Sequence, residues 1–348
     1  MQLNILSRSV GRARVLGAGK VLQNTIKGLK QIGVDISLNE PISNHRYNWI
    51  HDAPERIIEA GFARRPVLVG PNTATTPEDL PKFRRLLHPS SIYLFPSEWP
   101  MNAWKSMGFN ECQSRVWAAG IELEKFPTQI RLSTNPDIVL IYFKSRAEEL
   151  LSRTKELVVQ CGSQFEVIRY GSYEESDYKS ALSRAKYGIW IGGTESQGFA
   201  LMEALASGLP LIVLDAQSLA DNVHTVKDPL IPVFSKQFIE SGASAAPYFD
   251  QCCGIKINES NLNKKTLEIF LKDIESFSPS SYVHEKFSLR QCAKRLVELA
   301  EELPDIDASS AKSGAVFAKS LYFLDLTTRA WPWKLASKIL INTITNWK

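Results

Sequence analysis

Short, uninterrupted apolar runs alternate with polar or amphipathic segments along the whole chain. Three of these runs lie in the second half, at Asp137–Phe143, Tyr187–Ile191 and Leu211–Leu214. Continuous apolar runs of this length are typical of strands in a parallel sheet that is covered on both faces. Between the last two runs, apolar residues recur at helical spacing from Phe199 to Ala206, and Ser207–Pro210 ends that helix. The pattern predicts a strand, a glycine-containing turn, a helix and a strand.

The first half shows the same alternation. A polar loop is expected over Ser7–Ala18, followed by a helix over Lys20–Ile32 that presents one apolar face and ends at Gly33. Further strand and helix candidates are Leu3–Leu6, Asp35–Leu38, Trp49–Ile50, Pro66–Val69 and Ile92–Phe95, then Val167–Tyr173 and a helix over Tyr178–Lys186. Both halves of the chain are therefore predicted to be α/β.

Composition narrows the class of protein. The chain has 348 residues, 44% apolar and 22% charged, which is ordinary globular composition and enough for two domains. Its net charge of +4 is too small to indicate a nucleic-acid partner. Five cysteines form no Cys-x-x-Cys pair, and no run approaches the ~20 apolar residues of a membrane span. We expect a cytoplasmic protein that is soluble, or peripheral at the inner face of the membrane.

The predicted turn and helix after Ile191 carry two carboxylates, Glu195 and Glu203. The turn follows the carboxyl end of a strand, where open α/β sheets bind ligands, and the free N–H groups of a helix start attract phosphate. With the helix beginning near Gly198, the two carboxylates are separated by roughly 10 Å. One can hold a hexose and the other a ribose, with a diphosphate between them.

The segment Gly193–Pro210 resembles the Glu-x7-Glu motif of retaining glycosyltransferase family 4. The resemblance implies the GT-B fold, in which two Rossmann-like domains face each other across a cleft. It implies that Glu195 contacts the transferred hexose near its reacting carbon, and that Glu203 binds the ribose hydroxyls. The backbone amides that would hold sugar and phosphate are those of Ser196, Gln197, Gly198 and Phe199. The alternative is that Glu203 is a solvated helix residue and Glu195 an acid favoured by the helix dipole.

Two further segments, Pro96–Trp99 and Trp117–Phe126, resemble the end of the first domain in this family. The polar stretch Pro127–Pro136 with its two prolines is then the interdomain linker. The expected division is an acceptor-side domain over residues 1–127, a nucleotide-sugar-binding domain over 136–303 and a C-terminal extension over 304–348.

Family members often carry an arginine after the first strand of the second domain, and a lysine about six residues later, to neutralise the phosphates of the nucleotide-sugar. Lys144 matches the arginine position, but Leu150 stands where the lysine belongs, which leaves Arg146 as a substitute cation. The turn around Gly171 lies in the region where the family contacts the nucleobase. Both basic residues have the alternative of being solvated at the end of a strand.

Gly17 and Gly19 lie in the loop after the first strand. A P-loop is excluded because Arg14 and Val21 occupy positions that require glycine and Ser or Thr, and Leu22 occupies the third glycine position of a dinucleotide fingerprint. In the resembling family a glycine-rich loop at this place approaches the diphosphate. The alternative is a plain turn.

The acceptor side matches the family less well. Its members often carry a histidine after a mid-domain strand, whereas here Val67–Val69 is followed by Gly70–Asn72. His51 follows another strand and is a candidate to line the cleft, although a lone histidine is also an ordinary structural residue. The family's retaining chemistry is thought to use the leaving diphosphate as base, so this departure does not exclude transfer.

No metal or cofactor is expected. Asp305-Ile306-Asp307 spells the Asp-x-Asp pattern of metal-dependent glycosyltransferases, but it follows a predicted helix and is interpreted as linker. The tail Phe317–Lys348 mixes aromatic, basic and aliphatic residues, which suits either a membrane-interface helix or a helix that packs back on the first domain. Its tryptophans are Trp331, Trp333 and Trp347.

The sequence thus predicts a retaining, metal-independent hexosyltransferase that uses a nucleotide-diphosphate sugar and a glycan or lipid-linked acceptor, without a nucleic-acid partner. Two alternatives stay open: a GT-B protein that binds nucleotide-sugar without transferring it, and a GT-B sugar-nucleotide epimerase.

Overall fold

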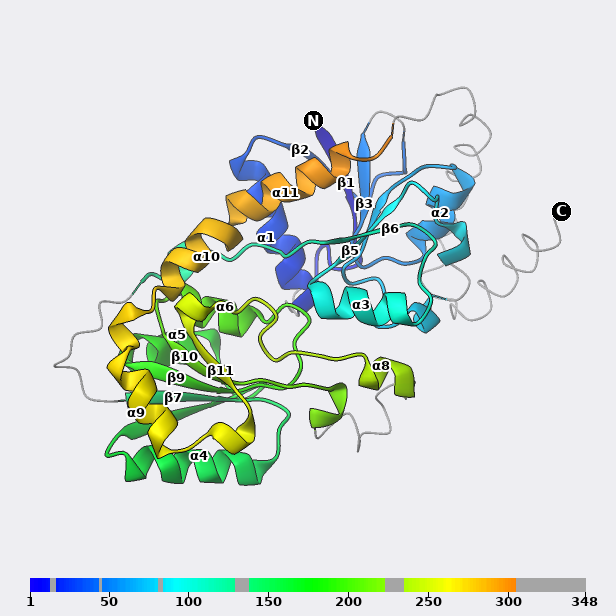
Figure 1. Ribbon diagram of the computed structural model, residues 1–348. Helices are drawn as coiled ribbons and strands as arrows, with labels where there is room; N and C mark the ends of the chain where they lie inside the picture. The colour runs from blue at the N-terminus through cyan, green and yellow to red at the C-terminus, as the bar shows by residue number, and fades with distance from the viewer. Residues whose placement is uncertain (13–16, 44–45, 81–83, 129–137, 223–234, 305–348) are drawn as a thin grey trace. The chain divides into compact units, whose positions relative to one another are not determined.

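The computed structural model describes residues 1–12, 17–43, 46–80, 84–128, 138–222 and 235–304. The chain divides into two compact units (Figure 1). Of the described residues, the first contains Met1–Leu94, Phe109–Arg115 and Arg295–Pro304, and the second contains Phe95–Gly108 and Val116–Lys294. Most of the predicted linker 127–136, nearly all of the extension 304–348 and the Asp305-Ile306-Asp307 pattern lie outside the described residues.

The first unit is built on a six-stranded sheet with the order β2-β1-β3-β4-β5-β6. The pairs from β2 through β5 are parallel. Its strands are β1 Gln2–Leu6, β2 Asp35–Leu38, β3 Tyr47–Ile50, β4 Leu68–Val69, β5 Ile92–Phe95 and β6 Gln113–Val116. The strand order reverses between β1 and β3, so the carboxyl ends of these two strands flank the topological switch point of the sheet.

Helices α1 (Gly17–Gln31) and α2 (Arg56–Phe62) follow β1 and β3. Helix α1 begins at Gly17, three residues before the predicted start at Lys20, so Gly17 and Gly19 lie in its first turn rather than in a free loop. Its apolar face buries Val21, Leu22 and Leu29, as the sequence pattern predicts. Short 3-10 turns occur at Pro77–Asp79 and Arg84–Leu86.

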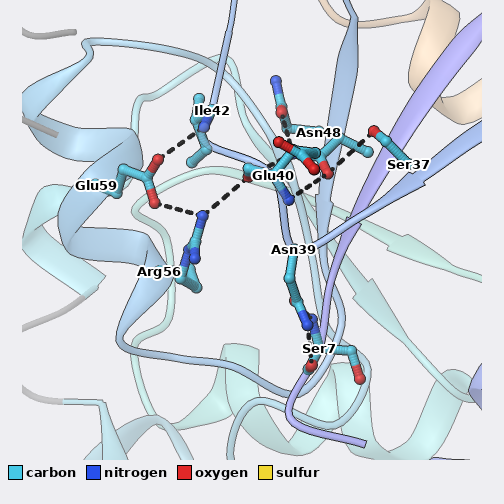
Figure 2. A network of polar contacts seen from close by, with 9 residues as sticks. Ser7, Ser37, Asn39, Glu40, Ile42, Asn48, Arg56 and Glu59 are labelled. Atoms are coloured by element: carbon cyan, nitrogen blue, oxygen red, sulfur yellow. Dashed lines mark hydrogen bonds and ion pairs between the residues drawn. The ribbon is translucent and has the colours of Figure 1, made fainter. Parts of the chain in front are cut away.

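A buried polar network fixes the segment between β2 and β3 (Figure 2). Asn4 donates from Nδ2 to the carbonyl of Glu40 at 2.9 Å, and Arg56 donates from Nη2 to the same carbonyl at 3.0 Å. Arg56 also pairs with Glu59 at 2.7 Å, and Glu59 accepts from the backbone N–H of Ile42 at 2.7 Å. Both charged side chains are at most 10% exposed, so each charge offsets the cost of removing the other from water.

The second unit is built on a five-stranded parallel sheet with the order β11-β10-β9-β7-β8. Its strands are β7 Ile138–Phe143, β8 Gln164–Arg169, β9 Tyr187–Ile191, β10 Leu211–Leu214 and β11 Gly254–Ile257. The order reverses between β7 and β9, which places the switch point at the ends of two strands that the apolar runs had predicted. Helix α6 (Phe199–Ala206) connects β9 to β10.

Both faces of this sheet are covered, as continuous apolar strands require. On one face Tyr142 and Trp190 stack with ring centroids 3.9 Å apart, in a core shared with α5 (Glu175–Arg184), α6 and α10 (Pro279–Phe287). On the other face Ile141 and Ile189 share a core with α4 (Glu148–Gln160) and α9 (Lys264–Lys272). The remaining helices are α3 Glu98–Ser106, α8 Lys236–Glu240 and α11 Leu289–Glu301. Short 3-10 turns occur at Leu123–Lys125, Leu219–Asp221, Gln251–Cys253, Glu259–Asn261 and Ile274–Ser276.

The two parallel-sheet units confirm the α/β class predicted from the sequence. A search of the described helices finds none with both the length and the apolar character needed to cross a bilayer.

The Arg56–Glu59 pair gives a stability prediction. We expect Arg56→Met to lower the free energy of unfolding by about 3 kcal/mol, because the buried carboxylate of Glu59 loses its cation. Adding Glu59→Gln removes the orphaned charge and keeps an oxygen for the N–H of Ile42, so the double variant should recover part of the loss. Urea denaturation of the three proteins measures this, and a double variant less stable than Arg56→Met would contradict it.

Candidate functional site

The second unit carries an ion pair at its switch point. Lys144 directly follows β7, and its backbone N–H donates to the carbonyl of Ile191 at 2.9 Å, so the ends of β7 and β9 are joined. The Nζ atom of Lys144 lies 2.6 Å from Oε1 of Glu195. Their side chains are 16% and 18% exposed, so the pair is largely but not completely shielded from solvent. The structure thereby brings together two residues that the sequence singled out from segments 51 positions apart.

The surroundings of this pair set its electrostatics. Burial raises the pKa of Glu195, and the neighbouring Lys144 opposes that shift. Lys144 also lies over the ring of Tyr170, with Nζ 4.3 Å from the ring centroid. A shielded carboxylate and ammonium act on a bound ligand more strongly than the same charges in water.

Side chains of the second unit support the turn that carries Glu195. Arg146 donates from Nη1 to the carbonyl of Gly192 at 3.1 Å and also pairs with Glu259. Asn222 accepts the backbone N–H of Thr194 at 2.9 Å. The Arg146 side chain is only 5% exposed, so in this structure it supports the turn.

The backbone N–H of Glu195 donates to the carbonyl of Ser244 at 2.9 Å. The hydroxyl of Ser244 in turn donates to Asp215 at 2.9 Å, at the end of β10. Gly193 has no room for a side chain, since a Cβ there would lie 2.5 Å from Oδ1 of Asn222. The turn therefore has little freedom to move away from Lys144.

The residues expected to supply backbone amides lie between this turn and α6. Gly198 precedes the helix with φ 83° and ψ 60°, a left-handed conformation that glycine adopts without strain, and Phe199 is the first helical residue. Gln197 is buried, and its side chain both accepts from the N–H of Ala119 at 3.0 Å and donates to the carbonyl of Ala119 at 2.7 Å. Gln197 therefore fixes the helix start through its side chain, which the sequence motif did not indicate.

Glu203 lies in α6 and is 4% exposed, so the alternative of a solvated helix residue is wrong. Burial raises the pKa values of Tyr173 and Tyr178, and the charge of Glu203 adds to this shift. The pKa of Lys125 is raised mainly by its hydrogen bond with Glu122, and Glu203 contributes less. Glu203 is thus a buried carboxylate whose charge acts on two tyrosines and a lysine. Hydroxyl-bearing ligands suit such a group because a carboxylate accepts several hydrogen bonds.

Gly171 follows β8 with φ 79°, and a Cβ there would have no atom within 4 Å. It therefore borders open space beside Tyr170. The lysine position of the family is occupied by Leu150, which is 3% exposed in the core between the sheet and α4.

His51 lies at the other switch point, in the first unit. It directly follows β3 and is fully buried. Its Nε2 atom lies 3.3 Å from Nδ2 of Asn72, and its Nδ1 atom has no hydrogen-bond partner. Burial lowers the pKa of His51 to about 4, against the opposing charge of Asp52, so the ring is neutral at pH 7. His51 is therefore a buried neutral side chain with an unused polar atom.

Asp52 is the charged neighbour of that histidine. Burial acts to raise the pKa of Asp52, but a hydrogen bond from Ser9, the effect of His51 and the N–H of Arg8 outweigh it and leave the pKa below its usual range. The N–H of Arg8 lies 2.7 Å from Oδ1 of Asp52. The carboxyl ends of β1 and β3 are joined in this way.

The sequence did not single out Trp99, Ser97, Asn222 or Ser244, which hold the turn through backbone groups. Their only signal was that Ser97 and Trp99 belong to a family-like segment. Among the described residues no three His, Cys, Asp or Glu side chains gather in a metal-binding cluster.

No protein-family model matches the chain, and no curated protein matches it. Several solved structures do. Sucrose-phosphate synthase from Thermosynechococcus elongatus has 12% sequence identity and a TM-score of 0.49, over 87% of this chain and 98% of that chain. HepE of Anabaena in complex with UDP-glucose has 13% identity and a TM-score of 0.49, over 87% of this chain and 100% of that chain.

The catalytic domain of starch synthase IV from Arabidopsis thaliana, bound to ADP and acarbose, has 11% identity and a TM-score of 0.45, over 94% of this chain and 99% of that chain. The two parallel-sheet units confirm the α/β part of the predicted fold class, and the arrangement of two such domains across a cleft stays a prediction. At these TM-scores the similarity does not assign an activity.

His51 gives a prediction of pH dependence. Its pKa of about 4 in the folded chain lies below the unfolded value of about 6.5, so the unfolded state binds more protons between these values. The stabilisation is complete above the unfolded pKa and is lost as the pH falls through the folded pKa. We expect the free energy of unfolding to fall by about 3 kcal/mol less in His51→Gln than in the wild type between pH 7 and about pH 4.

Urea denaturation at a series of pH values measures this difference. The control is His284→Gln, which also removes an imidazole but at an exposed position. An equal pH dependence in His51→Gln and wild type would show that the ring is not held neutral by burial.

Proposed function

We propose that this chain is a retaining glycosyltransferase that moves a hexose from a nucleotide-diphosphate sugar to a glycan or lipid-linked acceptor. The observation that carries the proposal is the shielded Lys144–Glu195 pair at the β7/β9 switch point, next to the start of α6. A carboxylate suits the sugar and an ammonium suits the diphosphate. Their contact of 2.6 Å supports the proposal that both groups act on a single glycosyl–phosphate bond.

Glu195 has the role of positioning the hexose and stabilising the positive charge that develops at its anomeric carbon. Its raised pKa is relevant because only the ionised carboxylate provides this stabilisation. Lys144 keeps that carboxylate ionised and has N–H groups left for phosphate oxygens, since an ammonium carries three. As the sugar–phosphate bond breaks, the charge on the diphosphate grows and its attraction to Lys144 strengthens.

Glu203 has the role of binding the ribose hydroxyls, and the open turn at Gly171 that of bordering the nucleobase. The backbone N–H groups from Ser196 to Phe199 have the role of holding the sugar and the phosphates, supported by the dipole of α6. Arg146, which bonds the carbonyl of Gly192, contributes positive charge next to the turn. No metal is required in this scheme, because Lys144 and the helix start supply the positive charge.

The first unit has the acceptor-side role. Gly17 and Gly19, in the first turn of α1, leave backbone N–H groups accessible to phosphate oxygens. The ring of His51 is fully buried, so it would support the acceptor side from inside the unit rather than bond an acceptor hydroxyl directly. A lipid-linked acceptor would bring the protein to the membrane surface as a peripheral protein.

One observation favours a second candidate, a protein that binds nucleotide-sugar without transferring it. Leu150 is buried in the apolar core, at the position where the resembling family has a second phosphate-neutralising lysine. This chain therefore has no such cation at that position. Stabilisation of the leaving diphosphate then rests on Lys144 and the helix start.

The two carboxylates should separate binding from turnover. Glu203→Ala should weaken nucleotide-sugar binding by about 2 kcal/mol, because charge-assisted hydrogen bonds to the ribose are lost. Glu195→Ala should lower turnover more than binding. Calorimetry with a panel of nucleotide-sugars gives the affinity, and release of free nucleoside diphosphate gives the turnover. The exposed residue Glu156 on α4 provides the control variant Glu156→Ala.

Binding without any transfer or hydrolysis would favour the second candidate, and wild-type behaviour of both variants would refute the site.

The assay contains EDTA, and full loss of activity that manganese restores would contradict the metal-independent scheme.

Lys144 should also control the pH dependence of the reaction. Glu195 must be ionised, so activity falls as the pH drops through its raised pKa. Lys144→Met removes the group that opposes this shift, so the acid limb of kcat/KM should move to higher pH, in addition to any fall in the maximum rate. The control is Lys179→Met, since Lys179 also forms a 2.6 Å pair, with Glu175, but at an exposed position. An unmoved acid limb in Lys144→Met would contradict the assignment of Glu195.

A further inference from the structure

The turn of Glu195 is also held through its carbonyl groups. The indole Nε1 of Trp99 donates to the carbonyl of Glu195 at 2.8 Å. The hydroxyl of Ser97 donates to the carbonyl of Ser196 at 2.5 Å. Both hydrogen-bond donors lie at the start of α3, in a segment that belongs to the second unit. The carbonyl groups of two successive residues in the turn therefore accept hydrogen bonds from side chains about 100 residues earlier in the chain.

These bonds complete the fixation of Glu195. Its N–H donates to Ser244 and its carbonyl accepts from Trp99, so both backbone groups of this residue are bound. Only the side-chain torsions of Glu195 are then left to vary, and the contact with Lys144 limits these. A carboxylate held in this way sits at a defined distance from the bond that is to be broken.

The start of α3 is itself anchored. The hydroxyl of Tyr248 donates to the carbonyl of Pro96, and the side chain of Gln237 donates to the carbonyl of Ser106 at the other end of the helix. Ser244, which accepts the N–H of Glu195, lies in the same stretch of chain as these two residues. Segment 237–248 therefore supports the turn both directly and through α3.

We infer that Trp99, assisted by Ser97, is a positioning residue that fixes the backbone of Glu195 for the transfer step. This inference rests on the proposed function for its catalytic consequence, but its structural part does not. In this role Trp99 does not contact the reacting atoms and acts only through the peptide groups of the turn. The nucleoside end of the ligand would be bound by Glu203, which this contact does not involve.

The decisive variant is Trp99→Phe, which keeps an aromatic ring and removes the indole N–H. We expect kcat to fall roughly tenfold, because a catalytic group held less firmly spends less time in the productive geometry. The affinity for a free nucleoside diphosphate should change less than about twofold, since lost positioning of Glu195 does not alter the other contacts. Ser97→Ala should show the same split between kcat and affinity in weaker form.

Hydrogen–deuterium exchange of the ligand-free protein provides a readout that does not need activity. Trp99→Phe should speed exchange of the backbone N–H groups in residues 192–198, including that of Glu195. The control is Trp104→Phe, because Trp104 lies in the same helix and its ring packs on Phe95. This control should change the thermal stability while leaving exchange in the turn and kcat as in the wild type.

Unchanged exchange in the turn of Trp99→Phe would overturn the inference, whatever the activity. Faster exchange with unchanged kcat in an active protein would also overturn it, because the fixation would then have no catalytic consequence. Parallel losses in kcat and nucleoside diphosphate affinity would indicate general damage to the site and overturn it as well. A wild-type chain without transfer or hydrolysis would refute the proposed function separately, and the exchange data would then decide the positioning alone.

Discussion

The contact between Lys144 and Glu195 lies at the topological switch point of the parallel sheet in the second unit, where the strand order reverses between β7 and β9. It is a costly contact to build, since both charges lose most of their water and must compensate each other. The surrounding architecture serves that requirement. The strand ends bring the two backbones together, glycines at positions 193 and 198 allow the tight path of the turn, and buried side chains bind its peptide groups. A parallel sheet covered on both faces gives these groups a rigid base.

The apolar runs were sufficient to predict most strands of both sheets, because a strand buried on both faces leaves a continuous signal in the sequence. Helix α6 and its glycine were predictable for a similar reason, since local stop and start signals decide where a short helix lies. The start of α1 was not, because Gly17 and Gly19 weaken helix propensity and tertiary packing overrides it.

The candidate site divides along the same line. Lys144 and Glu195 could be found from the sequence because both follow predicted strands and match positions of the resembling family. The roles of Arg146 and Gln197 in supporting the turn could not, because their partners are backbone carbonyl and N–H groups far away in the chain, and a backbone group leaves no mark on the sequence. The same reason hid Asn222 and Ser244. The identity of a side chain indicates which ligands it can bind, whereas its support of a loop depends on which backbone groups the fold brings next to it.

The division of the chain has a consequence for anyone who would exchange parts of this protein. The backbone passes from one unit to the other after Leu94, Gly108, Arg115 and Lys294, and the last of these crossings lies within the continuous helix α11. Neither unit is therefore a contiguous piece of sequence, and no single cut releases one of them intact. A chimera that grafts a new first unit onto this second unit has to be spliced at all of these crossings, with the register of α11 preserved across the last junction.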